Sequence, residues 1–372
     1  MSTLSCDISG PHYQSIQIEL TNRCNLSCKT CIRTVPGINL QEQDLSSSAI
    51  QNLKPSLEHT DAVHLQGWGE SMLLGDLPDR IRCFKLKGCK VSFTTSGSLM
   101  TKQQAAELVS CGLDAITFSM AGATVTLQED LRGKGSHARL WQSMQLVQEA
   151  KQQAGSKTPA MAVSYLLTTE SINELPLAVK FCWPFGLSLF AGVQLTHAAT
   201  TRQQDLCLFS SCPGQRFKRL IRHAHWHAFW GGIRLQLPQF LPDLTPICEK
   251  NPLASCFIAA DGSVAPCVFL YPPHSGIPVN WYTKKGHLAA PIKRFGSLYQ
   301  ETLDQIWQRT EYQSFRKLFK DRLDFYEKKM GHVGCGMDGI EQLDIVRKSI
   351  RKAFLKRPVP DCCQNCPKME GF

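Results

Sequence analysis

Short runs of apolar or alternating residues are separated by longer amphipathic stretches in the first half of the chain. Six runs predict strands: Ser15–Leu20, Ala62–Leu65, Lys90–Thr94, Ala115–Ser119, Ala160–Leu167 and Ser188–Leu195. The stretches between them predict helices at Ser47–Glu58, Ile81–Leu86, Thr101–Ser110, Ala138–Gln152 and Asn173–Phe181. Strands that alternate with helices pair in parallel through crossover connections. The pattern therefore predicts an α/β fold, either a parallel sheet or a partial (β/α)6 barrel similar to a TIM barrel, with its chemistry at the carboxyl ends of the strands.

The pattern changes after Leu195. A helix is expected over Gln215–Phe229 and a strand over Gly232–Leu237, and from Cys248 onward cysteines and Pro/Gly turns dominate. The end of the chain holds two further helical stretches, Leu303–Leu323 and Gly339–Leu355. We therefore expect three parts: a barrel over residues 14–200, a connecting helix and strand over 201–245, and a smaller C-terminal domain over 246–372.

The composition is that of an ordinary globular protein, with 43% hydrophobic and 19% charged residues among 372. This balance excludes a disordered or fibrous chain. The longest apolar stretch, Phe181–Val193, is interrupted by Pro184 and is too short to span a bilayer, and the N-terminus lacks the pattern of a signal peptide. We therefore expect a cytoplasmic protein that does not associate with membranes.

The chain carries 17 cysteines and a formal net charge of +10. In a reducing cytosol such thiols serve as metal ligands, catalytic groups or small buried side chains rather than in disulfides. Most of the positive charge lies beyond Lys284. This basic region is a solvated helix face, a docking surface for an acidic electron donor, or a binding surface for an anionic substrate. It lacks the interleaved aromatic residues that favour binding of single-stranded nucleic acid.

Three cysteines follow the first predicted strand at the spacing CxxxCxxC: Cys24, Cys28 and Cys31. Three thiolates this close in sequence can bind three irons of a four-iron, four-sulfur cluster, which leaves the fourth iron open to a substrate or cofactor. A zinc site would require a fourth Cys or His nearby, and none lies between Glu19 and Gln41. The spacing therefore favours an open 4Fe-4S cluster, with chance clustering as the alternative.

With this motif after the first strand, the chain resembles the radical S-adenosylmethionine (SAM) superfamily. In that family SAM chelates the open iron, and its reductive cleavage yields a 5′-deoxyadenosyl radical that abstracts a hydrogen atom. The sequence Gly67-Trp68-Gly69-Glu70, after the second strand, is similar to the family's GGE motif, which binds the methionyl ammonium group. The alternative is a plain βα turn that requires glycines.

Three more residues match positions that contact SAM in the family. Ser119 ends the fourth strand, and Arg132 follows it at a distance similar to that of the Ser and Arg that bind the SAM carboxylate. A planar guanidinium suits a carboxylate, although a solvated surface arginine is the alternative. Ser96, in Thr95-Ser96-Gly97, takes the place of Asn in the family's TNG turn. Thr30 stands where the family usually has an aromatic residue, so the chain departs from the family there.

A second cysteine set lies in the last third of the chain. Cys248 and Cys267, with Gly262 between them, resemble the opening of the SPASM/twitch extension of radical SAM enzymes, and Cys363 and Cys366 add a CxxC. These four thiols are expected to bind an auxiliary 4Fe-4S cluster, with a zinc ribbon as the alternative on coordination chemistry. The further cysteine run of a full SPASM domain is absent, so one auxiliary cluster is expected. The spare thiols are Cys256, Cys335 and Cys362.

The resemblance implies SAM-dependent radical chemistry with two candidate outcomes. The first is an oxidoreductase (a dehydrogenase) acting on a small biosynthetic intermediate, whose radical gives its electron to the auxiliary cluster. The alternative is a maturase that cross-links or epimerises a ribosomally made peptide, and an epimerase would use Cys335 as the candidate catalytic hydrogen-atom donor. Only about 14 residues precede the first strand, which favours the small molecule because many peptide maturases carry a leader-binding domain there.

The expected partners follow from the same chemistry. They are SAM, a small-molecule or peptide substrate, and an electron donor such as flavodoxin or ferredoxin. Neither a membrane nor a nucleic acid is expected as a partner. A non-enzymatic zinc or nucleic-acid-binding protein is a remote alternative, because it leaves the N-terminal motifs unexplained.

Overall fold

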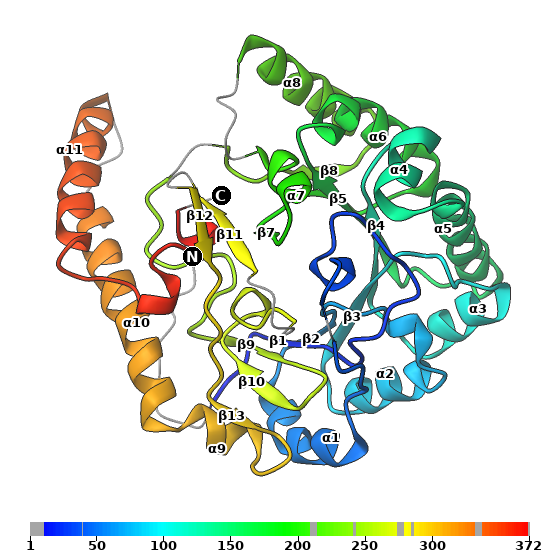
Figure 1. Ribbon diagram of the computed structural model, residues 1–372, viewed down its shortest axis with the longest axis horizontal. Helices are drawn as coiled ribbons and strands as arrows, with labels where there is room; N and C mark the ends of the chain where they lie inside the picture. The colour runs from blue at the N-terminus through cyan, green and yellow to red at the C-terminus, as the bar shows by residue number, and fades with distance from the viewer. Residues whose placement is uncertain are drawn as a thin grey trace.

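The computed structural model describes residues 11–38, 40–208, 214–240, 243–273, 279–283, 286–331 and 337–370. Its centre is a sheet of ten strands in the order β13-β10-β9-β1-β2-β3-β4-β5-β6-β8 (Figure 1). The strands from β9 through β1 to β8 are parallel to their neighbours, as crossover connections require. The predicted α/β fold with a parallel, barrel-type sheet is therefore confirmed.

Two sets of residues alternate along the parallel strands. These strands are β1 (Ser15–Ile18), β2 (Ala62–Leu65), β3 (Lys90–Thr95), β4 (Ala115–Met120), β5 (Ala160–Leu167), β6 (Leu189–Gln194) and β8 (Arg234–Gln236). One set, which includes Ile16 and Val63, is apolar and fully buried. The other includes Gln17, Thr94 and Ser119, which line an interior cavity. A period of two therefore gives the sheet one apolar face for the core and one polar face for a site.

Helices surround the outer side of this sheet (Figure 1). They are α1 (Ser47–Leu53), α2 (Leu77–Leu86), α3 (Lys102–Ser110), α4 (Val125–Arg132), α5 (Ser136–Gln153), α6 (Leu175–Phe181) and α8 (Gln215–Trp230). The short helix α7 (Thr201–Asp205) lies inside this ring (Figure 1), where Gln203 donates to the carbonyl of Lys29. Ser46, Thr101 and Thr124 each accept a hydrogen bond from a first-turn N–H group, and they fix the starts of α1, α3 and α4. Apolar residues of the helices join the buried strand residues in one large core.

The C-terminal third adds strands to the same sheet. β9 (Ser255–Ile258) pairs in parallel with β1, while β10 (Ser263–Ala265) lies antiparallel between β9 and β13 (Gly296–Ser297). A smaller sheet joins β7 (His197–Ala198), β11 (Asn280–Thr283) and β12 (Gly286–Ala289). The main sheet therefore continues beyond residue 246, where a separate domain was expected to begin.

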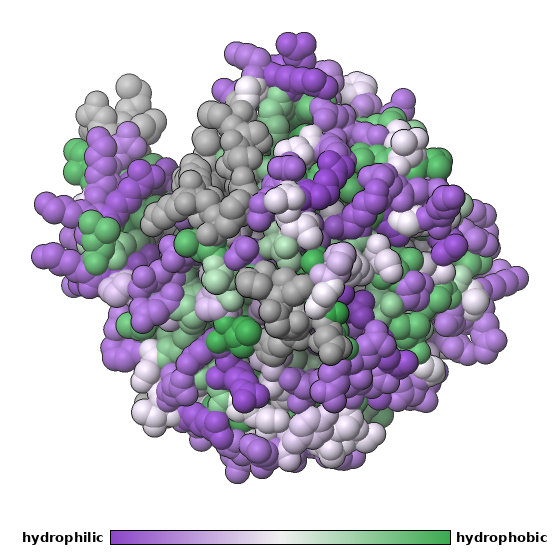
Figure 2. Space-filling model, viewed as in Figure 1, coloured by the Kyte–Doolittle hydropathy of each residue, from purple (hydrophilic) through white to green (hydrophobic). Residues whose placement is uncertain are grey.

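Three helices complete the C-terminal part: α9 (Leu303–Trp307), α10 (Thr310–Met330) and α11 (Met337–Phe354). α10 and α11 lie side by side along the left edge of Figure 1. Hydrophilic side chains cover much of the face shown in Figure 2, with apolar side chains in smaller patches between them. Within the described residues, no helix has both the length and the apolar character that a membrane crossing requires.

The six predicted strands are all present, with ends within two residues of the predicted ones. The predicted helix Ser47–Glu58 is instead α1 followed by a 3-10 helix at Lys54–His59, because Pro55 cannot continue an α-helical hydrogen-bond ladder. The predicted helix Leu303–Leu323 is two helices, α9 and α10. Helix α4 was not predicted, although Thr124 and Gly133, its two capping residues, mark its ends.

Candidate active site

A cavity of about 380 Å³ opens at the carboxyl ends of the parallel strands, a volume in the range of small-molecule sites. The residues predicted to bind the first cluster and SAM all line it: Cys24, Cys28, Cys31, Gly67, Trp68, Gly69, Glu70, Ser96, Ser119 and Arg132. The opposite wall comes from the C-terminal third, through Glu249, Lys250, Val268, Phe269 and Lys368. The cavity therefore has walls from both predicted parts of the chain.

The loop with the first three cysteines is fixed by contacts on both sides. The Thr34 hydroxyl donates to the carbonyls of Cys28, at 2.7 Å, and Cys31, at 3.0 Å. The backbone N–H of Lys29 donates to Leu131 in α4, and its ammonium group pairs with Asp130. These contacts hold the cysteine loop against the end of α4, and so beside Arg132.

The three thiols have the surroundings of cluster ligands. Burial raises the pKa of Cys31 to about 11 and also raises the pKa of Cys24, while backbone N–H groups nearby oppose the shift. A cluster must therefore displace protons from these thiols when it binds. Within the described residues, no three Cys, His, Asp or Glu side chains form a site for a single metal ion. A four-iron cluster needs no such convergence, because each thiolate binds a different iron.

Gly67 and Gly69 allow two loops to approach closely. A Cβ atom on Gly69 would lie 2.1 Å from the carbonyl oxygen of Thr21, and one on Gly67 would lie 2.4 Å from the Glu19 side chain. The next residue, Glu70, donates its backbone N–H to the carbonyl of Arg23 at 2.8 Å. The glycines thus let the β2 loop pack on the cysteine loop, which places Glu70 against Arg23, the residue before Cys24.

Glu70 is a buried carboxylate that lines the cavity. It accepts hydrogen bonds from the Thr95 hydroxyl at 2.9 Å, from the backbone N–H and the hydroxyl of Ser96, both at 2.8 Å, and from the N–H of Met72 at 3.2 Å. No ion pair within the described residues involves Glu70. The site therefore suits a cationic ligand, for which the Ser96 hydroxyl can turn towards its second partner, Ser98.

Arg132, the last residue of α4, brings a positive charge to the same cavity. Its Nε atom is buried without a hydrogen-bond partner, and no ion pair within the described part of the chain involves it. An enclosed N–H donor without an acceptor is costly, so this group suits a carboxylate ligand. Glu70 and Arg132 therefore supply one unpaired charge of each sign to the same cavity, as an amino acid zwitterion requires. Ser119 lines the cavity from the end of β4.

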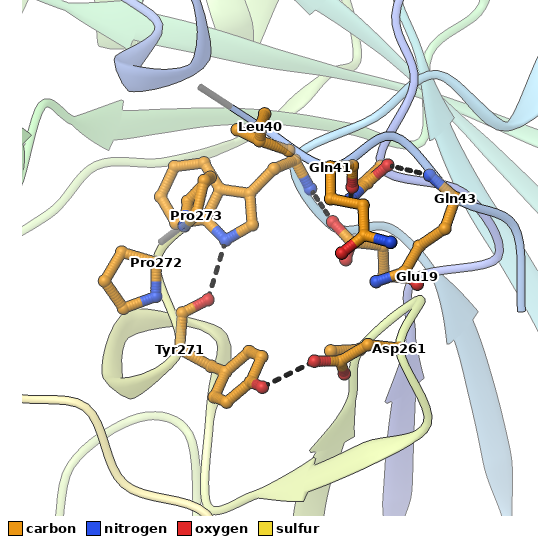
Figure 3. A pocket seen from close by; sticks show the side chains of 11 residues that line it. Glu19, Leu40, Gln41, Gln43, Asp261, Tyr271, Pro272 and Pro273 are labelled. Carbon is orange, nitrogen blue, oxygen red and sulfur yellow. Dashed lines mark hydrogen bonds between the residues drawn. The ribbon is translucent and has the colours of Figure 1, made fainter. Parts of the chain in front are cut away.

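Glu19, at the end of β1, was not singled out from the sequence. Its carboxylate accepts hydrogen bonds from the N–H groups of Trp68, at 2.6 Å, and Ala260, at 3.1 Å. Burial raises its pKa to about 7. Figure 3 shows Glu19 and Asp261 lining a second pocket of about 180 Å³, in which the Tyr271 hydroxyl points to Asp261. In the sequence, Glu19 is only one residue of an alternating strand. Its hydrogen bonds to the loops of Trp68 and Ala260 become evident only in the folded structure.

The second cysteine set is also brought together. Burial raises the pKa of Cys267, and the nearby Cys366 and Cys248 raise it further. A hydrogen bond with Cys362 and burial raise the pKa of Cys363, to which Cys267 and Cys366 also contribute. Backbone N–H groups after Cys248, Cys267 and Cys366 lie close enough to the sulfurs to oppose the rise. Hydrogen bonds of this kind tune iron–sulfur clusters. The four thiols therefore fit one cluster.

The spare thiols differ in their surroundings. Cys256 lies on β9 in the core, and burial raises its pKa to about 12. Cys362 lies beside Cys363 and shares a hydrogen bond with it. Cys335 lies outside the described residues, so its expected role as a hydrogen-atom donor stays a prediction. Thr30 lines the cavity, so no aromatic side chain occupies that position.

His197 joins the two sides of the cavity. Its ring stacks on Phe269 with centroids 5.7 Å apart and meets the Trp68 ring edge-on at 5.4 Å. The Trp281 indole donates to its Nε2 atom at 2.9 Å, and Nδ1 pairs with the Thr196 hydroxyl at 3.0 Å. Burial lowers its pKa to about 4, so the ring is neutral at physiological pH. Aromatic packing therefore connects the SAM-side wall with the loop that carries Cys267.

Comparison with known proteins bears on this geometry. The family description Radical SAM superfamily matches residues 18–182, and an iron–sulfur cluster-binding domain, SPASM, matches residues 248–331. A tungsten-containing aldehyde ferredoxin oxidoreductase cofactor-modifying protein of Pyrococcus furiosus is 24% identical over 323 residues, which cover 83% of this chain and 84% of the relative. An AdoMet-dependent heme synthase of Oleidesulfovibrio alaskensis is 25% identical over 348 residues, or 87% and 80% of the two chains.

A solved structure gives the same fold. Streptococcus suis SuiB bound to S-adenosylmethionine superposes with a TM-score of 0.59 and 14% identity, over 82% of this chain and 68% of that chain. The two matches imply SAM and 4Fe-4S clusters as cofactors. They include Cys24, Cys28, Cys31, Cys248 and Cys267, whereas Cys363 and Cys366 lie beyond the SPASM match. The chain therefore belongs to the radical SAM superfamily, as an enzyme with a SPASM-type auxiliary iron–sulfur domain towards its C-terminus.

Proposed function

We propose that this enzyme is a SAM-dependent oxidoreductase that removes two hydrogens from a small biosynthetic intermediate bound in the cavity. The observation that carries the proposal is the shared cavity, whose walls come from the loops of both cysteine sets. When bound, the first cluster and SAM supply hydrogen-atom abstraction from the substrate. A substrate held there lies between the group that starts the reaction and a group that can accept an electron.

In this proposal Cys24, Cys28 and Cys31 hold the first cluster. Glu70 binds the amino group of SAM and Arg132 binds its carboxylate, with Ser96 and Ser119 beside them. The support is that both charged groups line the cavity and lack an oppositely charged partner within the described residues. The protein thereby orients the methionyl part of SAM through two charge-assisted contacts.

Cys248, Cys267, Cys363 and Cys366 hold the second cluster, which is fully ligated and suited to electron transfer. When bound, a cluster at these thiols would supply an electron acceptor, so that the substrate would lose one hydrogen atom, one electron and one proton in all, with the proton passing to solvent. Phe269, two residues after Cys267, lies in the cavity wall and brings the substrate close to this cluster. The two relatives that match over most of the chain are named for a cofactor-modifying protein and a heme synthase, and both names support a small-molecule substrate.

A second candidate is modification of a ribosomally made peptide. The observation that favours it is the shared fold with SuiB, which binds a precursor peptide in one of its structures. Cross-linking of a peptide would use the same electron acceptor, whereas epimerisation would need a hydrogen-atom donor.

Product mass separates these functions. The enzyme with both clusters, SAM and a reductant is incubated with small anionic metabolites or with peptides, and products are analysed by mass spectrometry. The proposal predicts a small product lighter by two hydrogens. A peptide product would favour the second candidate, and an unchanged mass with deuterium from solvent would contradict oxidation.

A further inference from the structure

Three charged side chains cluster at the end of the cavity that the C-terminal third provides. The ammonium groups of Lys250 and Lys368 lie 3.9 and 3.1 Å from the same carboxylate oxygen of Glu249. Both ammonium groups also lie over the Phe269 ring, at 5.4 and 5.9 Å from its centroid. Two cations are therefore held close together by one carboxylate and one aromatic ring.

The charges of this cluster do not balance. The charged residues that line the cavity are Glu70, Arg132, Glu249, Lys250 and Lys368. Glu70 and Arg132 are assigned to the two ends of SAM, which leaves two lysines and one carboxylate. The Lys368 side chain is only 9% exposed, whereas that of Glu249 is 54% exposed. A surface carboxylate compensates a buried ammonium group poorly, so the cluster keeps an excess positive charge.

Gln194, at the end of β6, is a second indication of a ligand in this cavity, separate from the two lysines. The residue is 7% exposed, lines the cavity, and its Oε1 atom is buried without a hydrogen-bond partner. Its Nε2 atom donates to the carbonyl of Gln239 at 3.4 Å, which fixes the orientation of the amide. A buried acceptor without a donor is costly. Gln194 is three residues before His197, whose ring stacks on Phe269 beneath the two lysines.

We propose that Lys250 and Lys368 form an anion site that binds a carboxylate or phosphate group of the substrate, while Gln194 accepts a hydrogen bond from an N–H or O–H group of the same molecule. The inference rests on the proposed function, since it assigns the substrate of that cavity to the class of small anions with a hydrogen-bond donor. Lysine ammonium groups bind either anion as point charges, so the two sources share one chemistry.

An alternative role for the two lysines is to balance the negative charge of the auxiliary cluster, without binding an anion. Lys250 and Lys368 each lie two residues after a cysteine of the second set. If charge balance were their only role, their replacement would lower iron content or change the spectrum of the second cluster, and anions would bind no differently. The test therefore measures anion binding and cluster content in the same samples.

The probes are inorganic phosphate and carboxyl-labelled acetate. Each is titrated against the enzyme with both clusters and SAM bound, and the ³¹P or ¹³C line width is measured at each concentration. The proteins are the wild type, the double variant Lys250→Gln/Lys368→Gln, and the control Lys356→Gln, an exposed lysine away from the cavity. We expect saturable broadening of at least one probe in the wild type and the control. Loss of two charge-assisted contacts should weaken that binding about tenfold or more in the double variant.

The outcome of each arm is decisive. Broadening of phosphate alone assigns a phosphorylated substrate, and broadening of acetate alone assigns a carboxylate. Absence of saturable binding in the wild type, or equal binding in the double variant, would overturn the anion site. Formation of 5′-deoxyadenosine without substrate is followed in parallel. Absence of 5′-deoxyadenosine from the wild type would count against the proposed function, whereas weaker anion binding by the double variant at normal iron content supports the anion site itself.

Discussion

Glu70 and Arg132 carry opposite charges into one cavity, and neither has a charged partner within the described residues. Glu70 follows a turn and Arg132 ends a helix, and these positions explain why each was ambiguous in the sequence. A GxGE string is also a plain turn, and an arginine at a helix end is also a surface residue. In the structure both groups line the same cavity, and the enclosed Nε atom of Arg132 supports its proposed contact with SAM.

Replacement of Glu70 by Gln should weaken SAM binding by about 1.5–3 kcal/mol, or roughly 10- to 150-fold, because one charge-assisted contact is lost. Replacement of Arg132 by Gln should have an effect of similar size on the carboxylate end. Calorimetry with the enzyme carrying its clusters measures both. Iron content serves as the control and should not change. Wild-type affinity for SAM in both variants would contradict the proposed contacts with SAM.

Glu19 gives the enzyme a pH dependence of stability. Its folded pKa of about 7 is above its ordinary value of about 4.5, so the folded state binds the proton more tightly than the unfolded state. The stabilisation is complete below the unfolded pKa and is lost as the pH rises through the folded pKa. The free energy of unfolding should therefore fall by at most about 3 kcal/mol between pH 4.5 and pH 8.

Calorimetry under anaerobic conditions at pH 6 and pH 8 measures this change. The variant Glu19→Gln removes the titrating group and should show a smaller difference between the two melting temperatures. The variant Glu327→Gln, at an exposed position of α10, is the matched control and should behave as the wild type. An undiminished pH difference in Glu19→Gln would show that other groups cause it.

At the scale of elements, the loops after β1 and β2 act as one unit. Gly69 allows them to touch, since a Cβ atom there would meet the Thr21 carbonyl oxygen at 2.1 Å. The variant Gly69→Ala should separate the loops, lower the iron content of the first cluster and weaken SAM binding. Gly75→Ala is the control, because no atom lies within 4 Å of its added Cβ. Equal iron content and SAM affinity in the two variants would disprove the close-contact role.

The sequence predicted the positions of strands and helices better than it predicted which strands pair with each other. Hydrophobic periodicity located all six strands of the barrel, since alternation is a local property. It missed α4, whose eight residues are marked in the sequence by the capping residues Thr124 and Gly133 and not by length. It also separated the C-terminal part from the barrel, although β9 pairs with β1. Pairing between segments so distant in sequence leaves no periodic signal in either one.

The candidate site shows the same division. The three-cysteine spacing and the CxxC were visible because their thiols are close in sequence. Lys250, Lys368 and Gln194 were not singled out, since they come from three separate elements and only the folded chain places them around one cavity. The basic C-terminal region offered an indirect signal, because an anionic substrate was one of its three interpretations.

At the scale of the whole molecule, the loops that carry the two cysteine sets supply walls of one cavity. The continuous sheet fixes the second set against the barrel, and the packing of His197 between Trp68 and Phe269 closes the interface. Under the proposed oxidation, Cys363→Ser/Cys366→Ser should spare cleavage of SAM but greatly reduce substrate turnover, because the substrate radical loses its electron acceptor. Cys256→Ser, which changes a thiol of the core, is the control for general effects of thiol removal.

The most direct measurement counts iron and sulfide in the anaerobically reconstituted enzyme and in two variants, together with 5′-deoxyadenosine formed with a chemical reductant. We predict about eight irons per chain in the wild type and about four in each of Cys24→Ala/Cys28→Ala/Cys31→Ala and Cys363→Ser/Cys366→Ser. Only the triple variant should lose 5′-deoxyadenosine formation. Unchanged 5′-deoxyadenosine formation in the triple variant, or zinc in place of iron at the second set, would contradict the proposal that each cysteine set binds an iron–sulfur cluster beside the cavity.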